Sequence, residues 1–223
     1  MLVFCFVAMG SAQERVINQA EFDSVVAEGG KHRLKWKEKY RLTVTTYAKT
    51  EGRPAADWSS NMIFEYGAPR ELRSVTNSVF GEKIIPAKEF INIGDVSYQR
   101  TGSGSWTRHD STGASASEQT EKAKTPQPLS ITEIEYRYLG TENLAGKPVQ
   151  VYLKTERGTS TKDNGENVQT DRKAKFWISA DGLIVKSEYS TESRSTAQTF
   201  RTSVISQYEL DPTINITAPK IVS

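Results

Sequence analysis

The chain carries a stretch that reads Lys175-Phe176-Trp177-Ile178-Ser179, then Ala180-Asp181-Gly182, then Leu183-Ile184-Val185-Lys186-Ser187-Glu188-Tyr189. Asp-Gly between two β-rich runs is a strong hairpin signal, because Gly, and Asp at modest cost, accept the positive φ angles of a tight turn. The stretch therefore predicts two antiparallel strands joined by a short turn, and with them an antiparallel sheet.

Alternating runs on both sides of this hairpin predict further strands. The residues Ile134, Tyr136 and Tyr138 alternate with charged residues in 131–139, which is typical of a strand with one buried face. A second turn signal, Asp163-Asn164-Gly165, predicts that a strand over 149–157 returns as a strand ending at Ile178. Four consecutive antiparallel strands follow from these patterns.

The last long strand is expected over 196–208, where Phe200, Val204 and Tyr208 share one face. After it, Ile214 and Ile216 predict a short edge strand. The C-terminal half of the chain is therefore expected to be almost entirely β.

The N-terminal half begins with a predicted helix. Asn18 and Glu21 have the spacing of a capping box, in which short polar and acidic side chains satisfy the first amides of a helix. Phe22, Val25 and Val26 then form one apolar stripe, and Gly29-Gly30 predicts the end of the helix.

From residue 40 onward the apolar period changes from helical to two, with Leu42 and Val44 alternating with polar residues. Strands are also predicted over 62–66, 71–75 and 83–93, and a hairpin over 96–100 and 105–108. Residues 109–128 contain no apolar face and predict a long mobile loop. The fold class expected from these patterns is mainly β (α+β), with one or more short helices.

Composition limits the possible classes of protein. The 223 residues suit one domain, for which we expect the bounds 13–223. With 36% hydrophobic residues and a mean hydropathy of −0.55, the chain can form a core while many side chains face water. Its 29 basic and 27 acidic residues leave a net charge of +2, which argues against binding to nucleic acid.

Residues 1–12 form an uncharged apolar run that ends in small residues, which predicts the end of a secretory signal peptide cleaved after Ala12. The alternative is a buried N-terminal strand. Under the first interpretation the single cysteine, Cys5, leaves with the signal, so the mature protein has neither a disulfide nor a thiol nucleophile.

Motifs for catalysis or metal binding are missing from the sequence. The two histidines, His32 and His109, have no second ligand at metal spacing, and Gly102-Ser103-Gly104 fits a hairpin turn better than a nucleotide loop. Glu133 and Glu135 share one strand face and could act as an acid and base pair, but the alternating pattern favours two solvent-facing carboxylates. We therefore expect no enzyme, no metal and no cofactor.

An ordered set of motifs resembles the LolA/LppX-like periplasmic lipoprotein and lipid carriers of bacteria. The motifs are Asp95-Val96-Ser97-Tyr98-Gln99-Arg100 with Trp106, then Tyr138-Leu139-Gly140-Thr141-Glu142-Asn143-Leu144-Ala145-Gly146-Lys147-Pro148-Val149-Gln150-Val151-Tyr152, then Phe176-Trp177-Ile178-Ser179 with Asp181-Gly182-Leu183, and Tyr208-Glu209-Leu210-Asp211-Pro212 with Ile214, Ile216 and Pro219. The resemblance covers roughly the last 130 residues.

This resemblance implies a single curved antiparallel sheet that forms a half-open β-barrel and holds a lipid, an acyl chain or a lipoprotein. The expected ligand-binding residues are Tyr98, Trp106, Tyr136, Tyr138, Phe176 and Ile178. It also implies a periplasmic or secreted protein of the cell envelope. We further expect the protein to be a monomer. The alternative on the same fold is an envelope-stress sensor or interaction module with an envelope protein as its partner. Both a filled and a hollow barrel fit the sequence patterns.

Overall fold

The structure is a computed structural model, and it describes residues 14–34, 38–110 and 129–221. The predicted signal over 1–12 and residues 111–128 of the predicted loop lie outside the described residues. The first two residues of that predicted loop, His109 and Asp110, end a strand instead.

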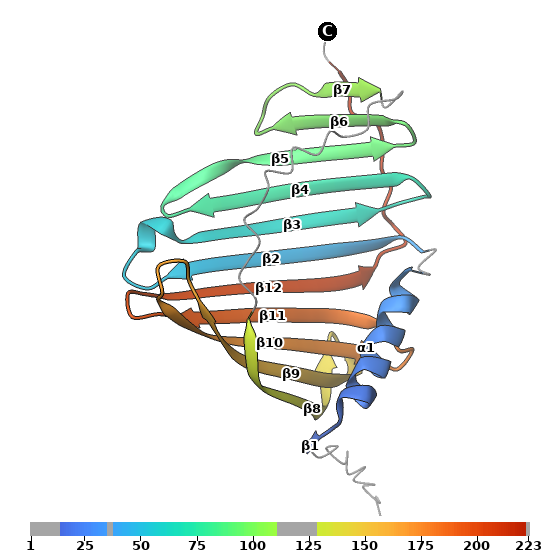
Figure 1. The fold of residues 1–223 in the computed structure, drawn as a ribbon. Coiled ribbons are helices and arrows are strands. Elements are labelled where there is room, and N and C mark those ends of the chain that lie inside the picture. The colour runs from blue at the N-terminus through green and yellow to red at the C-terminus, as the bar shows by residue number, and fades with distance from the viewer. Residues whose placement is uncertain (1–13, 35–37, 111–128, 222–223) are drawn as a thin grey trace, which may run out of the picture.

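The described part of the chain is a large sheet with one α-helix (Figure 1). Its elements are β1 (Arg15–Val16), α1 (Gln19–Leu34), β2 (Tyr40–Thr50), the short 3₁₀ helix η1 (Pro54–Ala56), β3 (Trp58–Tyr66), β4 (Glu71–Phe80), β5 (Lys83–Ile93), β6 (Val96–Thr101), β7 (Thr107–Asp110), β8 (Ser130–Leu144), β9 (Lys147–Thr161), β10 (Asn167–Ser179), β11 (Ile184–Arg194) and β12 (Thr199–Leu210).

All twelve strands of the described residues belong to one antiparallel sheet with the order β1-β8-β9-β10-β11-β12-β2-β3-β4-β5-β6-β7. The chain builds it as two meanders, β2 to β7 and β8 to β12, which meet where β12 pairs with β2. Strands β1 and β7 lie at opposite ends of the order, so the sheet is not closed. The predicted fold class, a curved antiparallel sheet forming a half-open barrel, is confirmed.

The hairpin predicted at Asp181-Gly182 joins β10 to β11. The Gly182 N–H donates to the Ser179 carbonyl at 2.9 Å, and Gly182 alone in the turn has a positive φ, 77°. The second predicted turn joins β9 to β10, with Gly165 at a φ of 81°. Both short-range signals in the sequence are therefore confirmed.

Helix α1 begins as the capping motif predicts but continues past its predicted end. The Asn18 side chain accepts a hydrogen bond from the Glu21 N–H at 2.8 Å. The helix does not stop at Gly29-Gly30 and runs to Leu34. A Cβ on Gly29 would lie 2.7 Å from the Ile184 side chain, so glycine there permits close contact between α1 and β11 and does not mark a helix end.

The pairing register assigns each side chain to one of two faces of the sheet. We call the side on which α1 packs the helix face and the other side the opposite face. Each face carries a buried cluster: Phe22 of α1 packs with Phe176 and Tyr136 on the helix face, whereas Val151 and Trp177 pack together on the opposite face. The sheet is therefore apolar in part on both sides.

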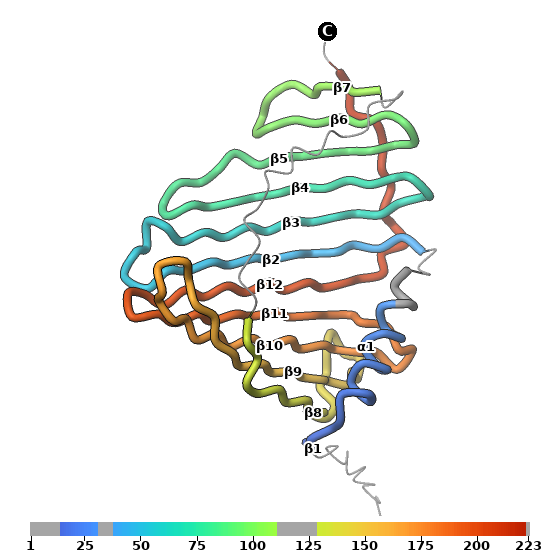
Figure 2. The backbone as a smooth tube through the Cα atoms, in the orientation of Figure 1, coloured from blue at the N-terminus to red at the C-terminus, as the bar shows by residue number. Residues whose placement is uncertain are grey.

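The C-terminal segment 211–221 is irregular and crosses the opposite face, running past the ends of β2 to β6 in red (Figures 1 and 2). The predicted edge strand at Ile214 and Ile216 is wrong, since these residues form no strand. Both side chains are buried against Ile91 and Tyr98. Alternating apolar residues indicate extended backbone with one buried side. Here the buried side chains pack on a face of the sheet, and the backbone does not pair with an edge strand.

Candidate functional site

The candidate site is a row of large apolar side chains on the helix face, which we call the apolar strip. Residues that pair across neighbouring strands lie on the same face of the sheet. Phe176 of the cluster under α1 pairs with Ser187, and the same row continues through Ser206 and Val44 to Met62, so the strip and the cluster share the helix face. The strip consists of Leu42, Val44, Trp58, Met62, Phe64, Phe80, Phe90, Tyr189, Phe200, Val204 and Tyr208.

The side chains of the strip are only partly covered. Leu42, Val44, Met62 and Phe64 are half-buried, while Phe80, Tyr189 and Phe200 are exposed. Small hydroxyl residues, among them Thr46, Ser60 and Ser74, lie between some of these side chains on the same face. Large partly exposed apolar side chains gathered on one face are typical of a binding surface. The strip lies beside α1 and extends from β11 to β5.

Helix α1 fills the helix face at the other end of the row. The ring of Phe22 lies 5.1 Å from that of Tyr136 and 5.9 Å from that of Phe176, and Tyr138 lies 5.2 Å from Tyr152. Burial raises the pKa of Tyr152. This end is thus a packed core, and next to it begins the apolar surface that no described element covers.

Four of the six residues predicted to bind a ligand lie together in this packed core. Tyr136, Tyr138, Phe176 and Ile178 all belong to the buried cluster under α1. The other two, Tyr98 and Trp106, lie in the cluster on the opposite face that the C-terminal segment covers. The structure therefore separates the predicted set into two groups on different faces.

Several cavities open along the helix face. One of about 720 Å³ lies between β9 and β12; Val168 and Phe200 contribute apolar side chains to it, but most of its lining residues are polar or charged. Another of about 640 Å³ lies at the stacked rings of Tyr40 and Tyr66, whose centroids are 4.4 Å apart. They adjoin the apolar strip, one at each end of its strands.

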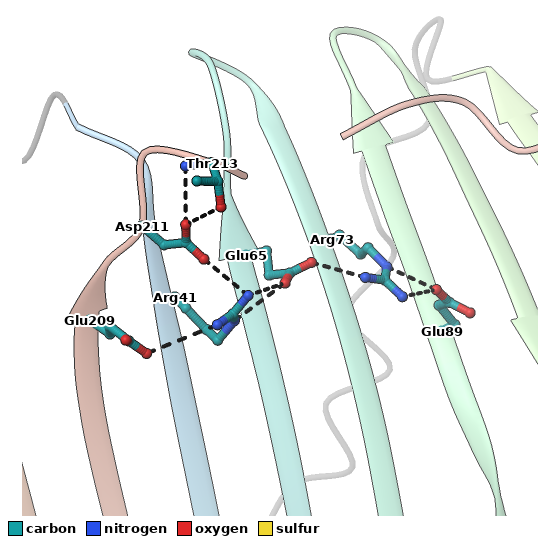
Figure 3. A network of polar contacts seen from close by, with 7 residues as sticks. All are labelled: Arg41, Glu65, Arg73, Glu89, Glu209, Asp211 and Thr213. Carbon is teal, nitrogen blue, oxygen red and sulfur yellow. Dashed lines mark hydrogen bonds and ion pairs between the residues drawn. The ribbon is translucent and has the colours of Figure 1, made fainter. Parts of the chain in front are cut away.

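The opposite face has a different chemistry, because charged side chains cross it in rows. In one row Arg41 contacts Glu65 at 3.0 Å, and Arg73 contacts Glu65 at 3.0 Å and Glu89 at 2.8 Å (Figure 3). Arg100 extends the row at 2.6 Å from Glu89. Burial alone would raise the pKa of Glu89, but hydrogen bonds from Arg100 and Arg73 outweigh it and lower that pKa.

The C-terminal segment is tied into this row at its start. Asp211 lies 3.1 Å from Arg41, and the Lys39 ammonium donates to the Ile214 carbonyl at 2.7 Å (Figure 3 shows Asp211). Hydrogen bonds from the hydroxyl and N–H of Thr213 lower the pKa of Asp211. The segment is therefore held by charges at one end and by buried isoleucines further on.

A groove of about 820 Å³ on the opposite face is lined mainly by charged and hydroxyl side chains of β8 to β12 and β2. In it Arg157 lies 2.9 Å from Glu133 and 3.0 Å from Asp171. Glu135 is paired with Arg137 at 2.7 Å, so the two glutamates considered as an acid and base pair each have a basic partner. A surface with this charge density does not suit an apolar ligand.

Metal clusters and membrane-spanning helices were both sought within the ranges described above. These ranges contain no group of three His, Cys, Asp or Glu side chains that could hold a metal ion. They also contain no helix that is long and apolar enough to cross a membrane. The Nε2 atom of His109 lies 3.0 Å from the side-chain nitrogen of Gln99 on the helix face.

No protein-family model matches the chain, and no curated protein matches it. Among solved structures, LprF from Mycobacterium bovis is 12% identical over 90% of this chain and 97% of its own, with a TM-score of 0.42. The LolA superfamily protein NE2245 from Nitrosomonas europaea is 8% identical over 84% and 90% of the two chains, with a TM-score of 0.27. A domain named for outer-membrane lipoprotein sorting, from Vibrio parahaemolyticus, is 11% identical over 86% and 93%, with a TM-score of 0.28.

All three TM-scores lie below 0.5, and the sequence identities are 12% or lower. We take no ligand, partner or site from these proteins.

The strip on β2 to β5 was missed as a site by reasoning from sequence. The sequence does contain a signal for it: Leu42 and Val44 alternate with polar residues, and Met62 and Phe64 lie in a β-rich run. The same signal occurs in every strand with one buried face, so it could not distinguish an uncovered surface from a core.

Proposed function

We propose that this chain is an exported, non-catalytic binding protein that holds a lipid or an acyl chain of a lipoprotein on the apolar strip. The observation that carries the proposal is the strip itself, whose side chains from Leu42 to Phe90 lie on one face and stay partly exposed. Transfer of an acyl chain from water onto such a surface is favourable in proportion to the apolar area that is covered.

In this proposal the predicted residues under α1 border the site and do not line it. Tyr136 and Phe176 pack against Phe22 of α1, so the apolar strip begins beyond them. Tyr98 and Trp106 lie on the opposite face and take no part in it. The ligand in this proposal contacts strands β11, β12 and β2 to β5.

The proposal extends to the whole chain. Residues 13–223 form one domain, residues 1–12 act as the end of a signal peptide, and the protein works as a monomer in the periplasm or outside the cell. The balanced net charge of +2 and the paired charges on the opposite face are consistent with a partner that is apolar and not a nucleic acid.

A fluorescence titration with a dansyl-labelled fatty acid tests this function. We expect saturable binding to the purified chain and weaker binding to Met62→Gln by about tenfold, since that side chain lies in the middle of the strip. Ile63→Gln is the matched control, because Ile63 is the next residue of β3, is also half-buried and lies on the opposite face. Equal loss in both variants, or no saturable binding to the unmodified chain, would contradict the proposal.

A further inference from the structure

The strands of the apolar strip end, away from α1, in an exposed apolar hairpin. The β10–β11 turn lies beside α1, where the Gly182 carbonyl approaches Gly29. Following the antiparallel order from there, the β4–β5 hairpin lies at the far end of the strands, on the left of Figure 1. Phe80 and Ile84 flank its turn, and their exposed fractions are 52% and 79%.

These two side chains project from different sides of the hairpin. Phe80 pairs with Trp58 and continues the apolar strip on the helix face. Ile84 pairs with Val79, which is one residue out of phase and so belongs to the opposite face. A flat protein partner would cover one of these sides, whereas a fluid apolar medium can surround both.

The β4–β5 hairpin also contacts the 3₁₀ helix η1. The Gly81 N–H donates to the Asp57 carbonyl at 2.7 Å, and a Cβ on Gly81 would lie 3.0 Å from the Ala55 carbonyl oxygen, so the tip rests on η1. The turn itself carries exposed Glu82 and Lys83, whose charges can remain in water or among lipid headgroups while the apolar neighbours leave water. The tip is therefore a supported hairpin in which two exposed apolar side chains, Phe80 and Ile84, flank a charged turn.

From this geometry we infer that the β4–β5 hairpin tip, Phe80 to Ile84, docks the protein on the surface of a lipid bilayer. This inference rests on the proposed function, because the tip is continuous with the strip through Phe80 and Trp58. Docking there places the end of the strip at the bilayer surface, where an acyl chain can pass between the two without crossing water. The driving force is burial of apolar side chains, so charged lipids are not required.

Flotation of the full chain with vesicles of pure phosphatidylcholine tests the inference. We expect the unmodified chain to float with the vesicles, and both Ile84→Asp and Phe80→Ser to bind them at least roughly tenfold more weakly. Ile221→Asp is the control, since Ile221 is 48% exposed and lies in the C-terminal segment. Thermal melting should be unchanged in Ile84→Asp, because that side chain is largely in solvent already.

Three results would overturn docking by the tip: no flotation of the unmodified chain, unchanged flotation of both tip variants, or an equal loss in Ile221→Asp. The fatty-acid titration separates this inference from the proposed function, because Ile84→Asp should bind the free fatty acid as the unmodified chain does. If the chain binds the fatty acid but does not float, docking alone fails. If it floats but binds no fatty acid, the proposed function fails and the docking surface stands.

Discussion

The ring of Phe22 in α1 lies 5.1 Å from the ring of Tyr136 in β8, and through this contact the single described α-helix closes one end of the helix face. Phe22 is buried, and it also meets the edge of Phe176. The contact divides the helix face into a packed part under α1 and an uncovered part, the apolar strip.

Phe22→Ala should therefore lower the free energy of unfolding by about 3 kcal/mol, since it removes a buried aromatic ring and leaves a cavity between α1 and the sheet. Chemical denaturation measures this value. Ser24→Ala, two residues further along the helix at an exposed position, should change stability by less than about 0.5 kcal/mol. A small effect of Phe22→Ala would show that α1 is not seated on Tyr136 and Phe176.

The charge row on the opposite face predicts an acid-dependent contribution from Glu89. Its pKa is lowered in the folded protein, so the stability it contributes is present above the ordinary value of 4.5 and is lost as the pH falls through the lowered value. Glu89→Gln should cost about 1.5–3 kcal/mol at neutral pH, because Arg73 and Arg100 both lose a charged acceptor. It should also flatten the fall of stability with pH below 4.5.

Urea denaturation across acidic pH checks this prediction, with Glu82→Gln on the exposed β4–β5 turn as the control. A variant at Glu89 that keeps the full acid dependence of the unmodified chain would argue against the charge row as its source.

The C-terminal segment should loosen when Asp211 loses its charge. The hydroxyl and N–H of Thr213, with Arg41 beside them, lower the pKa of Asp211, so this anchor is fully present above 3.8 and is released as the pH falls through the lowered value. Asp211→Asn should therefore increase hydrogen exchange at the amides of residues 213–216 at neutral pH. Asp181→Asn in the β10–β11 turn should leave exchange in that segment unchanged.

Ile216→Ala tests the apolar half of the same attachment. Ile216 is buried against the cluster that contains Ile91 and Tyr98, so its truncation should lower the free energy of unfolding by about 2–4 kcal/mol. Thr217→Ala, at the exposed neighbouring position, is the control. Equal stability of the two variants would show that the segment does not pack on the sheet in solution.

Much of the fold could be predicted from local patterns. The turns at Asp181-Gly182 and Asp163-Asn164-Gly165 define three neighbouring strands, and the cap at Asn18 marks the helix start, because each depends on the chemistry of a few consecutive residues. Gly29 misled the prediction of the helix end, since its role comes from the distant Ile184 side chain.

The site was harder to predict, because strand alternation gives two faces without saying which face of one strand continues that of another. Tyr98 and Tyr136 are both inward in their own alternation, yet the pairing register places them on different sides of the sheet. Nor does alternation show which apolar face is covered. Phe176 lies under α1, whereas Met62, on the same face, lies in the uncovered strip.

Native mass spectrometry tests most directly whether the apolar strip holds a lipid. The full chain is exported to the cell envelope of a bacterial host and purified without detergent. We expect a population heavier than the polypeptide by the mass of a lipid, which organic extraction removes and which is depleted in Met62→Gln but not in Ile63→Gln. A spectrum that shows only the bare polypeptide, unchanged after incubation with phosphatidylcholine, would contradict lipid binding on the strip.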